Sequence, residues 1–185
     1  AGGSRIDAAG VLSVDTHWRP SDTITVAGPL HVQPGVTLTI EANTVVKVET
    51  GHKITLDGTL IAQGTAVEKI YFTSHLDDAL GQNVSGGTTD TPVAGGWEAI
   101  YFQDGSDGSV LEHAEVRYAG NAASPGNASF FWYTIRLDRS EGTVLRNVDV
   151  LDSDGDGVAW INTGSFTLDN VHVERARNEA FHGSL

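Results

Sequence analysis

The chain contains no cysteine among its 185 residues. That absence excludes disulfide bonds, thiolate metal sites and a cysteine nucleophile, although it does not fix the cellular compartment. Lysine is nearly as scarce, with Lys47, Lys53 and Lys69 as the only three. The formal net charge is −13. So acidic a chain, with no basic patch, argues against nucleic acid and anionic membrane surfaces as partners.

Long apolar runs are also absent. No stretch approaches the roughly 20 apolar residues of a membrane-spanning helix, so no membrane span is predicted. No window keeps the period of an amphipathic helix either. The chain begins AGGSR without methionine, as a processed secretory protein or an excised piece of a longer chain would.

What the sequence does contain is an internal repeat. One set of aligned segments is VLEHAEV (110–116), VLRNVDV (144–150) and TLDNVHV (167–173), with EKIYF (68–72) resembling an earlier copy. A second set of short strands is AIYF (99–102), TIRL (134–137) and GVAW (157–160). The last two members of each set are 23 residues apart. This period suits a parallel β-helix coil of three short strands and their turns, whereas a β-sandwich needs no near-copies.

The repeats predict an all-β, single-stranded parallel β-helix, a solenoid of stacked coils. We expect an N-terminal extension or cap over residues 1–19 and the β-helix over residues 20–185, with long loops at 76–96 and 119–129. The 23-residue spacing aligns Phe181 with Val158, so the chain ends in mid-coil. A bare coil end exposes apolar side chains and strand edges, which favours end-to-end self-association.

One long stretch also resembles a known family. GVTLTIEANTVVKVETGHKITLDGTLIAQGTAVEKIYFTS (35–74), followed by GGWEAIYF (95–102), is similar to the opening coils of right-handed parallel β-helix domains of the pectate-lyase-like superfold. The resemblance implies right-handed coils and an extracellular or cell-surface location in a bacterium. The chain departs from the usual phrase at Ala42-Asn43, where Pro-Gly is common, and at Glu98-Ala99. Because the superfold carries lyases, hydrolases, adhesins and inert stalks, the resemblance implies little about activity.

The acidic turn DSDGDG (152–157) is a candidate metal site. Asp152, Asp154 and Asp156 alternate as in the first half of an EF-hand loop, but Thr163 stands where the bidentate acid is needed. The EF-hand interpretation therefore fails, and an ordinary turn before a strand is favoured. A surface calcium bound by the three carboxylates stays open as an alternative, and no cofactor is required.

Three polar residues, His113, Asn147 and Asn170, fall at one position of the repeat. We expect them to stack as an inward polar ladder that satisfies turn backbone groups. This structural role is favoured over catalysis, because buried polar groups are normally hydrogen-bonded.

Aromatic side chains are the candidate ligand contacts. The run FFWY (130–133) cannot point inward throughout, since side chains alternate along a strand. Rings on a rigid sheet can stack on sugar faces, although core filling or packing beneath a loop is an equal alternative. The predicted contacts to a carbohydrate or surface protein are Trp97, Tyr101, Tyr118, Phe131, Trp132 and Tyr133.

The leading functional hypothesis is a non-catalytic extracellular or surface module, a rigid spacer or adhesin-like unit that presents its loops. A polysaccharide lyase or glycoside hydrolase is the alternative. DGDG (154–157) and HG (182–183) faintly resemble motifs of pectin hydrolases, and Arg136 and Asp138 lie on a suitable strand, but no motif is complete.

Ice binding is a minor alternative. It rests on one outward file of threonines formed by Thr25, Thr39 and Thr55. Threonine is also simply a good outward residue in a strand, which weakens this interpretation.

Overall fold

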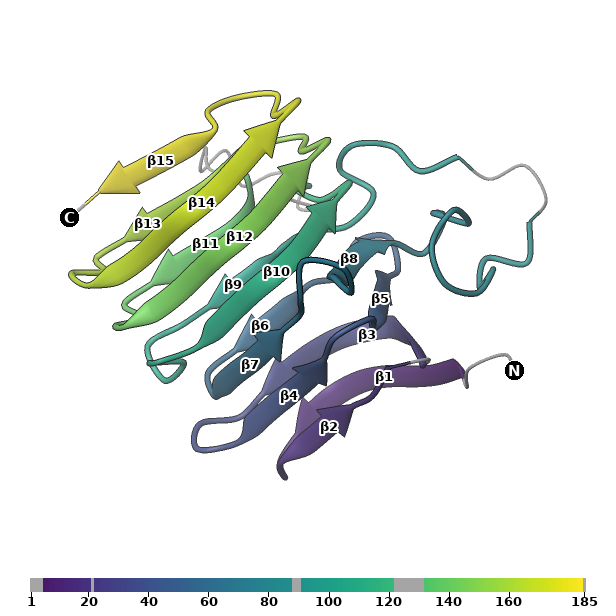
Figure 1. Cartoon of the computed structure of the whole chain (residues 1–185), viewed down its shortest axis with the longest axis horizontal. Coiled ribbons are helices and arrows are strands. Elements are labelled where there is room, and N and C mark those ends of the chain that lie inside the picture. Colours follow the sequence, from purple (N-terminus) through teal and green to yellow (C-terminus); the bar gives the residue numbers. More distant parts are fainter. Residues whose placement is uncertain (1–4, 21, 88–90, 122–131, 185) are drawn as a thin grey trace.

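The computed structural model describes residues 5–20, 22–87, 91–121 and 132–184. These ranges form strands and loops, with no helix among them that is long and apolar enough to cross a membrane. The strands pair in parallel and stack coil upon coil (Figure 1), which confirms the predicted parallel β-helix. The strands are β1 (Arg5–Leu12), β2 (Thr16–Trp18), β3 (Thr23–Val32), β4 (Thr37–Glu41), β5 (Val45–Val48), β6 (Ile54–Leu56), β7 (Thr59–Gln63), β8 (Ile70–Ser74), β9 (Ile100–Phe102), β10 (Val110–Arg117), β11 (Tyr133–Asp138), β12 (Thr143–Leu151), β13 (Asp156–Ile161), β14 (Phe166–Glu174) and β15 (Phe181–Ser184).

The coils present three faces, which we call sheets A, B and C. Sheet A contains the second half of β3 and then β6, β9, β11, β13 and β15. Sheet B contains β2, β4, β7 and the first halves of β10, β12 and β14. Sheet C contains the first half of β3, then β5, β8 and the second halves of β10, β12 and β14.

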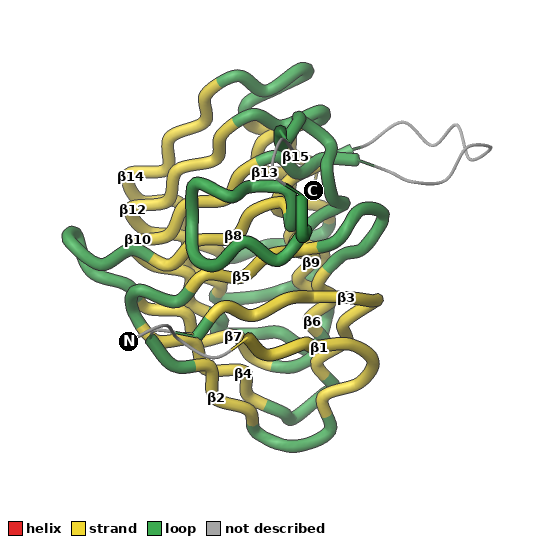
Figure 2. Tube along the Cα trace, turned by 90° about the vertical axis from the view of Figure 1, so that its right-hand side faces the viewer, coloured by secondary structure: helices red, strands yellow, loops and turns green. Residues whose placement is uncertain are grey.

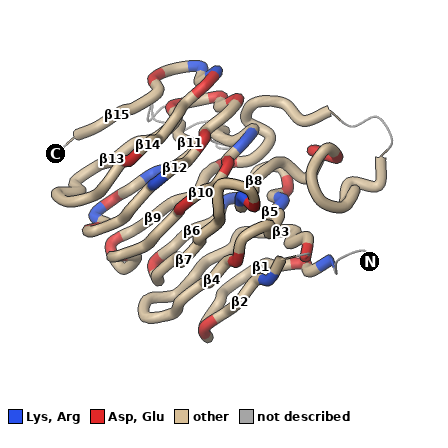
Figure 3. Tube along the Cα trace, in the orientation of Figure 1, with Lys and Arg blue, Asp and Glu red and all other residues tan. Residues whose placement is uncertain are grey.

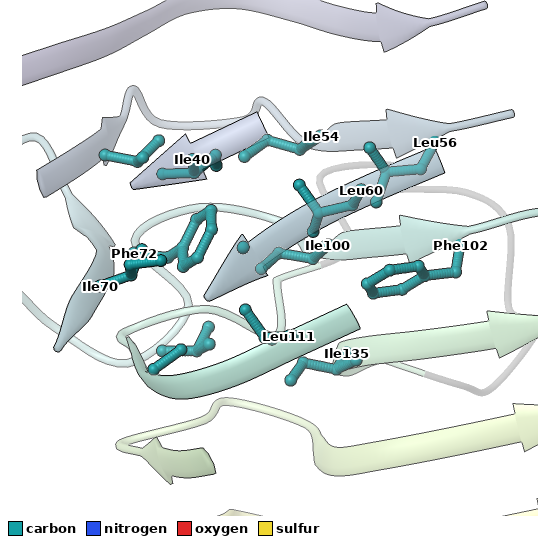
Figure 4. Close-up of a cluster of buried hydrophobic side chains, with 14 of the residues drawn as sticks. Ile40, Ile54, Leu56, Leu60, Ile70, Phe72, Ile100, Phe102, Leu111 and Ile135 are labelled. Atoms are coloured by element: carbon teal, nitrogen blue, oxygen red, sulfur yellow. The ribbon is translucent and has the colours of Figure 1, made fainter. Parts of the chain in front are cut away.

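The strand register agrees with the repeat. Leu111 pairs with Leu145, which pairs with Leu168, and Val158 pairs with Phe181 as the 23-residue spacing predicts. The segment around Ile70 is an earlier copy of the same strand, since Ile70 pairs with Ala114. Equivalent apolar side chains therefore lie above one another in the core (Figure 4). Each buried aliphatic side chain of this stack contributes about 1.5–3 kcal/mol relative to an exposed one.

The expected polar ladder exists, but its predicted inward direction was wrong. His113, Asn147 and Asn170 have φ values of 47°, 51° and 52°, so each makes the sharp corner between sheets B and C in the left-handed conformation. Their side chains lie outside that corner, where all three line a surface hollow with Lys69 and Asp149, and Asn170 Nδ2 donates to Asn147 Oδ1 at 2.8 Å. A fully buried ladder lies elsewhere, between Ser106 Oγ and Ser140 Oγ at 2.8 Å.

Residues 5–18, within the predicted extension or cap, form β1 and β2. Both strands pair in parallel with the next coil, β1 with β3 and β2 with β4. Most of β1 is exposed, while Ala8 and Leu12 pack partly against the core. This segment therefore adds one further coil to the stack.

The predicted threonine file was wrong. Thr25 pairs with Lys47 in sheet C, Thr39 with Ile61 in sheet B, and Thr55 pairs with His31 and Tyr101 in sheet A. Successive threonines of this set are 14 and 16 residues apart, whereas one coil separates Thr25 from Lys47 by 22 residues, so the three fall on three different faces. Thr25 is also fully buried. The array on which the ice-binding hypothesis rested is therefore absent from these positions.

Two long insertions leave the β-helix at one corner, between sheets C and A. The first joins β8 to β9 and the second joins β10 to β11. The first insertion passes over β5 and β8 (Figure 2), and its Asp77 and Gln82 carbonyls accept from Lys47 of β5, so it covers the outer side of sheet C. Of the predicted loop 119–129, the described part is 119–121. Both insertions therefore lead into neighbouring strands of sheet A, the first into β9 and the second into β11.

Candidate functional site

A groove of about 140 Å³ lies on the outer side of sheet A, where the two insertions join it. Strand β9 contributes Tyr101, and β11 contributes Tyr133 and Arg136. The strand pairing places Tyr101 and Arg136 directly beside each other. The remaining lining residues come from turns and insertion ends and are Lys53, Glu98, Ala99, Asn121 and Trp132.

The floor of the groove is formed by two tyrosines and one arginine, which are bonded to an aspartate outside the lining. The Arg136 guanidinium carbon lies 4.6 Å from the centre of the Tyr101 ring and 5.1 Å from that of Tyr133, which are cation–π distances. Arg136 Nη2 and Tyr101 Oη both donate to Asp138 Oδ2, at 2.7 and 2.9 Å. Burial raises the pKa of both tyrosines. The floor therefore presents neutral phenols around a guanidinium held in place.

Trp132 stands at the rim, with 36% of its surface exposed. Its carbonyl accepts a 2.6 Å hydrogen bond from the Asp156 amide. This close approach of the Trp132 backbone requires glycine at position 155, because a Cβ there would lie 2.2 Å from the Trp132 carbonyl oxygen. Arg177 lies beside the indole ring, at 5.9 Å from its centre. The backbone of Trp132 is therefore fixed while its ring remains accessible.

Trp97, predicted as a ligand contact, is a core residue instead. It is fully buried, and its indole Nε1 donates to the Arg117 carbonyl at 2.7 Å. Its own carbonyl accepts from the Asn121 amide at 3.2 Å, and the neighbouring Glu98 carbonyl accepts from the Gly120 amide at 2.8 Å. These bonds join the end of the first insertion to the start of the second. Trp97 thus positions the walls of the groove without facing a ligand.

The other predicted contacts divide between the groove and its surroundings. Tyr101, Trp132 and Tyr133 line the groove, while Phe131 lies outside the described residues. Tyr118 occupies a left-handed corner with φ of 60° and does not line the groove. Burial raises the pKa of Tyr118.

Sequence reasoning missed Lys53, Glu98 and Asn121 as groove residues. Each lies in a turn or an insertion end rather than in a repeated strand. Lys53 and Glu98 are 45 positions apart, yet Lys53 Nζ lies 3.6 Å from Glu98 Oε2. The signal that could have found this proximity is the pairing of Ile54 with Ile100. Lys53 and Glu98 both come just before these paired strands, β6 and β9.

The three aspartates of the acidic turn each bind a group one coil further along the chain. Asp152 accepts two hydrogen bonds from Arg175, at 2.6 and 3.0 Å, and this arginine lowers the pKa of Asp152. Each of the other two also has a partner 23 residues on: Asp154 binds Arg177 at 3.0 Å, and Asp156 accepts from the Glu179 amide at 3.1 Å. Among the described residues, no group of three or more His, Asp or Glu side chains could hold a metal ion.

Comparison with known proteins assigns no family. No protein-family model, curated protein or solved structure matches the chain. The parallel β-helix therefore rests on strand pairing, and function has to be inferred from the groove and its chemistry.

Removing calcium is expected to leave the melting temperature unchanged, because Asp152 and Asp154 are bound to arginines and Asp156 to a backbone amide. A calcium site held at a hundred times its dissociation constant would add about 2.7 kcal/mol, or about 5–10 °C for a chain of this size. Thermal unfolding with EDTA and with excess calcium checks this. A drop with EDTA that calcium reverses would make the aspartates ligands.

Proposed function

We propose that this chain is a non-catalytic carbohydrate-binding module of an extracellular or surface protein in a bacterium. The observation that carries the proposal is the exposed Trp132 ring at the rim of a groove with a Tyr101–Arg136–Tyr133 floor. An aromatic ring offers a flat apolar face to a sugar ring. Convergent polar groups beside it fix the orientation of a bound ligand. The β-helix serves as the rigid spacer that presents this groove.

The carboxylates in the groove and bonded to its floor favour binding over catalysis. Glycoside hydrolysis needs one carboxyl group that donates a proton and a second that acts as base or nucleophile. Asp138 accepts from Tyr101 and Arg136, and Glu98 lies 3.6 Å from Lys53. Both carboxylates are thus held by cations in structural pairs. We therefore keep a polysaccharide lyase or glycoside hydrolase as the second candidate function. The proposed binding needs no cofactor.

The proposed location draws on the resemblance of residues 35–74 to β-helix domains of the pectate-lyase-like superfold, found in secreted and surface proteins of bacteria. The lack of cysteine is compatible with this location without requiring it. The hypothesis also includes a protein partner at the same groove. The Trp132 ring and the polar groups beside it could contact a protein surface as well as a sugar.

Replacing Trp132 by alanine is expected to weaken carbohydrate binding about tenfold or more, because an exposed aromatic anchor commonly contributes a large share of an interface's energy. Affinity electrophoresis through gels that contain single polysaccharides, followed by calorimetry on those that retard the protein, measures the effect. Phe181→Ala is the matched control, since Phe181 is also exposed, at 40%, and lies in β15, two strands from β11, without lining the groove.

The same samples separate the competing functions. New reducing ends, or the ultraviolet absorbance of an unsaturated sugar, would identify an enzyme. Retardation by no polysaccharide in the panel would contradict carbohydrate binding. Equal loss of affinity in the Trp132 and Phe181 variants would move the site away from the groove.

A further inference from the structure

Each cation that lines the groove lies beside a carboxylate. Lys53 Nζ lies 3.6 Å from Glu98 Oε2, and Arg136 Nη2 lies 2.7 Å from Asp138 Oδ2. Lys53, Glu98 and Arg136 line the groove, and Asp138 is hydrogen-bonded to its floor, so these two cations and two carboxylates sum to no net charge. They stand in a chain whose formal net charge is −13, with acidic residues spread over its coils (Figure 3).

The arginine beside the rim is paired as well. Arg177 lies 5.9 Å from the centre of the Trp132 ring, and its Nη1 atom lies 3.0 Å from Asp154 Oδ1. Each Lys or Arg that borders the groove thus already has a carboxylate partner. An anionic ligand would have to compete with these carboxylates and would approach a strongly acidic protein, whose repulsion extends over about 10 Å at 0.1 M salt.

Asp138 is the least replaceable of these partners. Its side chain is only 10% exposed, and its Oδ2 atom accepts from both Tyr101 and Arg136. A ligand carboxylate that took its place on Arg136 would leave a buried carboxylate with fewer donors, which is costly. Displacement of Asp138 by an acidic sugar is therefore unfavourable.

Sugar hydroxyls meet no such obstacle. A hydroxyl both donates and accepts, so it can bind a lysine, an arginine or an amide and also a carboxylate without breaking an ion pair. Glu98, Lys53 and Asn121 lie along the groove as partners of these kinds. The volume of about 140 Å³ is small compared with the roughly 300–1,000 Å³ of typical ligand pockets, which suits a single ring in contact with Trp132.

We propose, on the basis of the carbohydrate-binding function above, that the groove selects neutral sugar residues and discriminates against those that carry carboxylate, sulfate or phosphate. The ring of the sugar stacks on Trp132, and its hydroxyls bind the paired charges of the groove. Selectivity arises because the cations are already neutralised by Glu98 and Asp138.

The test uses polysaccharide pairs that differ only in charge. Suitable probes are polygalacturonate with its carboxyl-reduced form, alginate with its carboxyl-reduced form, and carboxymethyl cellulose with hydroxyethyl cellulose. We expect binding to the neutral member of at least one pair and at least tenfold weaker binding to its acidic counterpart. Affinity for the neutral member should change less than about twofold between 0.05 and 0.5 M NaCl, since no charge on the ligand is screened.

Two kinds of failure remain distinct in this design. Preference for acidic members, with affinity that falls as salt rises, would overturn neutral selectivity and leave carbohydrate binding intact. Binding to no probe, and to no neutral polysaccharide in the wider panel, would overturn the proposed function and the selectivity with it.

Variants test the charge pairing directly. Glu98→Gln frees Lys53 from its partner at a partly exposed position, and Asp138→Asn frees Arg136 at a buried one. Each is expected to raise the ratio of acidic to neutral affinity several-fold and to introduce salt dependence. If Asp138→Asn fails to fold, Glu98→Gln still decides the matter. An unchanged ratio in Glu98→Gln would show that pairing does not set the selectivity.

Discussion

Trp97→Ala is expected to lower the free energy of unfolding by about 3–5 kcal/mol, the range for a core tryptophan, and to abolish binding at the groove. Trp97 is fully buried, and its indole donates to the Arg117 carbonyl. Its removal leaves a large cavity and takes a donor from that carbonyl. Chemical denaturation followed by circular dichroism measures the loss of stability.

The loss of binding follows from the place of Trp97 in the chain. Its carbonyl accepts from the Asn121 amide, and the next residue, Glu98, lines the groove and accepts from Gly120. A collapse around the missing indole would move Glu98 and Asn121 together. The groove would then lose one wall while Tyr101 and Arg136, which lie on paired strands, stayed in place.

Two further variants make this prediction specific. Trp132→Ala is the matched control, because it removes the same side chain at a partly exposed position and should leave stability nearly unchanged. Trp97→Phe keeps a ring but loses the hydrogen bond to Arg117, so its cost should lie between the other two. If the free energy of unfolding of Trp97→Ala differed from that of the parent chain by less than about 1 kcal/mol, Trp97 would not be the anchor of the insertions.

The repeat predicted strand pairing to the residue because stacked coils must align equivalent positions. Phe181 against Val158 follows from the 23-residue spacing, and Leu111 against Leu145 from the alignment of VLEHAEV with VLRNVDV. The same register places Tyr101 beside Arg136, since both follow paired isoleucines. The strand half of the groove could therefore be derived from the sequence.

The direction of side chains at the corners could not be derived in the same way. Alternation assigns His113 and Asn147 to a face only while the backbone stays extended. Both are left-handed, with φ of 47° and 51°, so the alternation breaks at each of them. Asn43 stands where the resembling phrase has glycine, and asparagine tolerates the left-handed conformation. Its φ of 64° is therefore predictable from the sequence, unlike those of His113 and Asn147.

The rest of the groove comes from the insertions and could not be predicted from the repeat. A repeat carries no information about the path of a segment that has no copy, so it could not place Trp97 in the core or bring Lys53 to Glu98. An insertion can also bury a side chain that points outward from the β-helix and would otherwise face solvent. Lys47 lies on the outer side of sheet C, where a lysine would normally be solvated, yet it is fully buried.

Lys47→Met is the second substitution with a large expected effect, a loss of about 3 kcal/mol in unfolding free energy. Lys47 Nζ donates to the carbonyls of Asp77 and Gln82, at 2.8 and 2.6 Å, and lies 3.9 Å from Asp78 Oδ1. Methionine has a similar length but no donor, so both carbonyls would lose a hydrogen bond. Burial lowers the pKa of Lys47, against the opposing effect of Asp78 and Asp77. Relief of that burial cost offsets part of the loss.

Thr25→Val is the matched control on the same covered surface. Thr25 pairs with Lys47, is also fully buried, and has a hydroxyl without a hydrogen-bond partner among the described residues. Valine keeps the shape and removes the unsatisfied oxygen, so stability should stay equal or rise slightly. A Lys47→Met variant as stable as Thr25→Val would show that the ammonium does not hold the insertion.

Hydrogen exchange locates the effect of Lys47→Met. We expect faster amide exchange over residues 75–87, because the Lys47 ammonium group hydrogen-bonds this segment to sheet C. Amides of the core strands should keep their order of protection. The same insertion continues to Trp97 and Glu98 at the groove. A loosened insertion has to be ordered when a ligand binds, which costs free energy. Lys47→Met should therefore weaken carbohydrate binding although Lys47 lies on another face, whereas Thr25→Val should not.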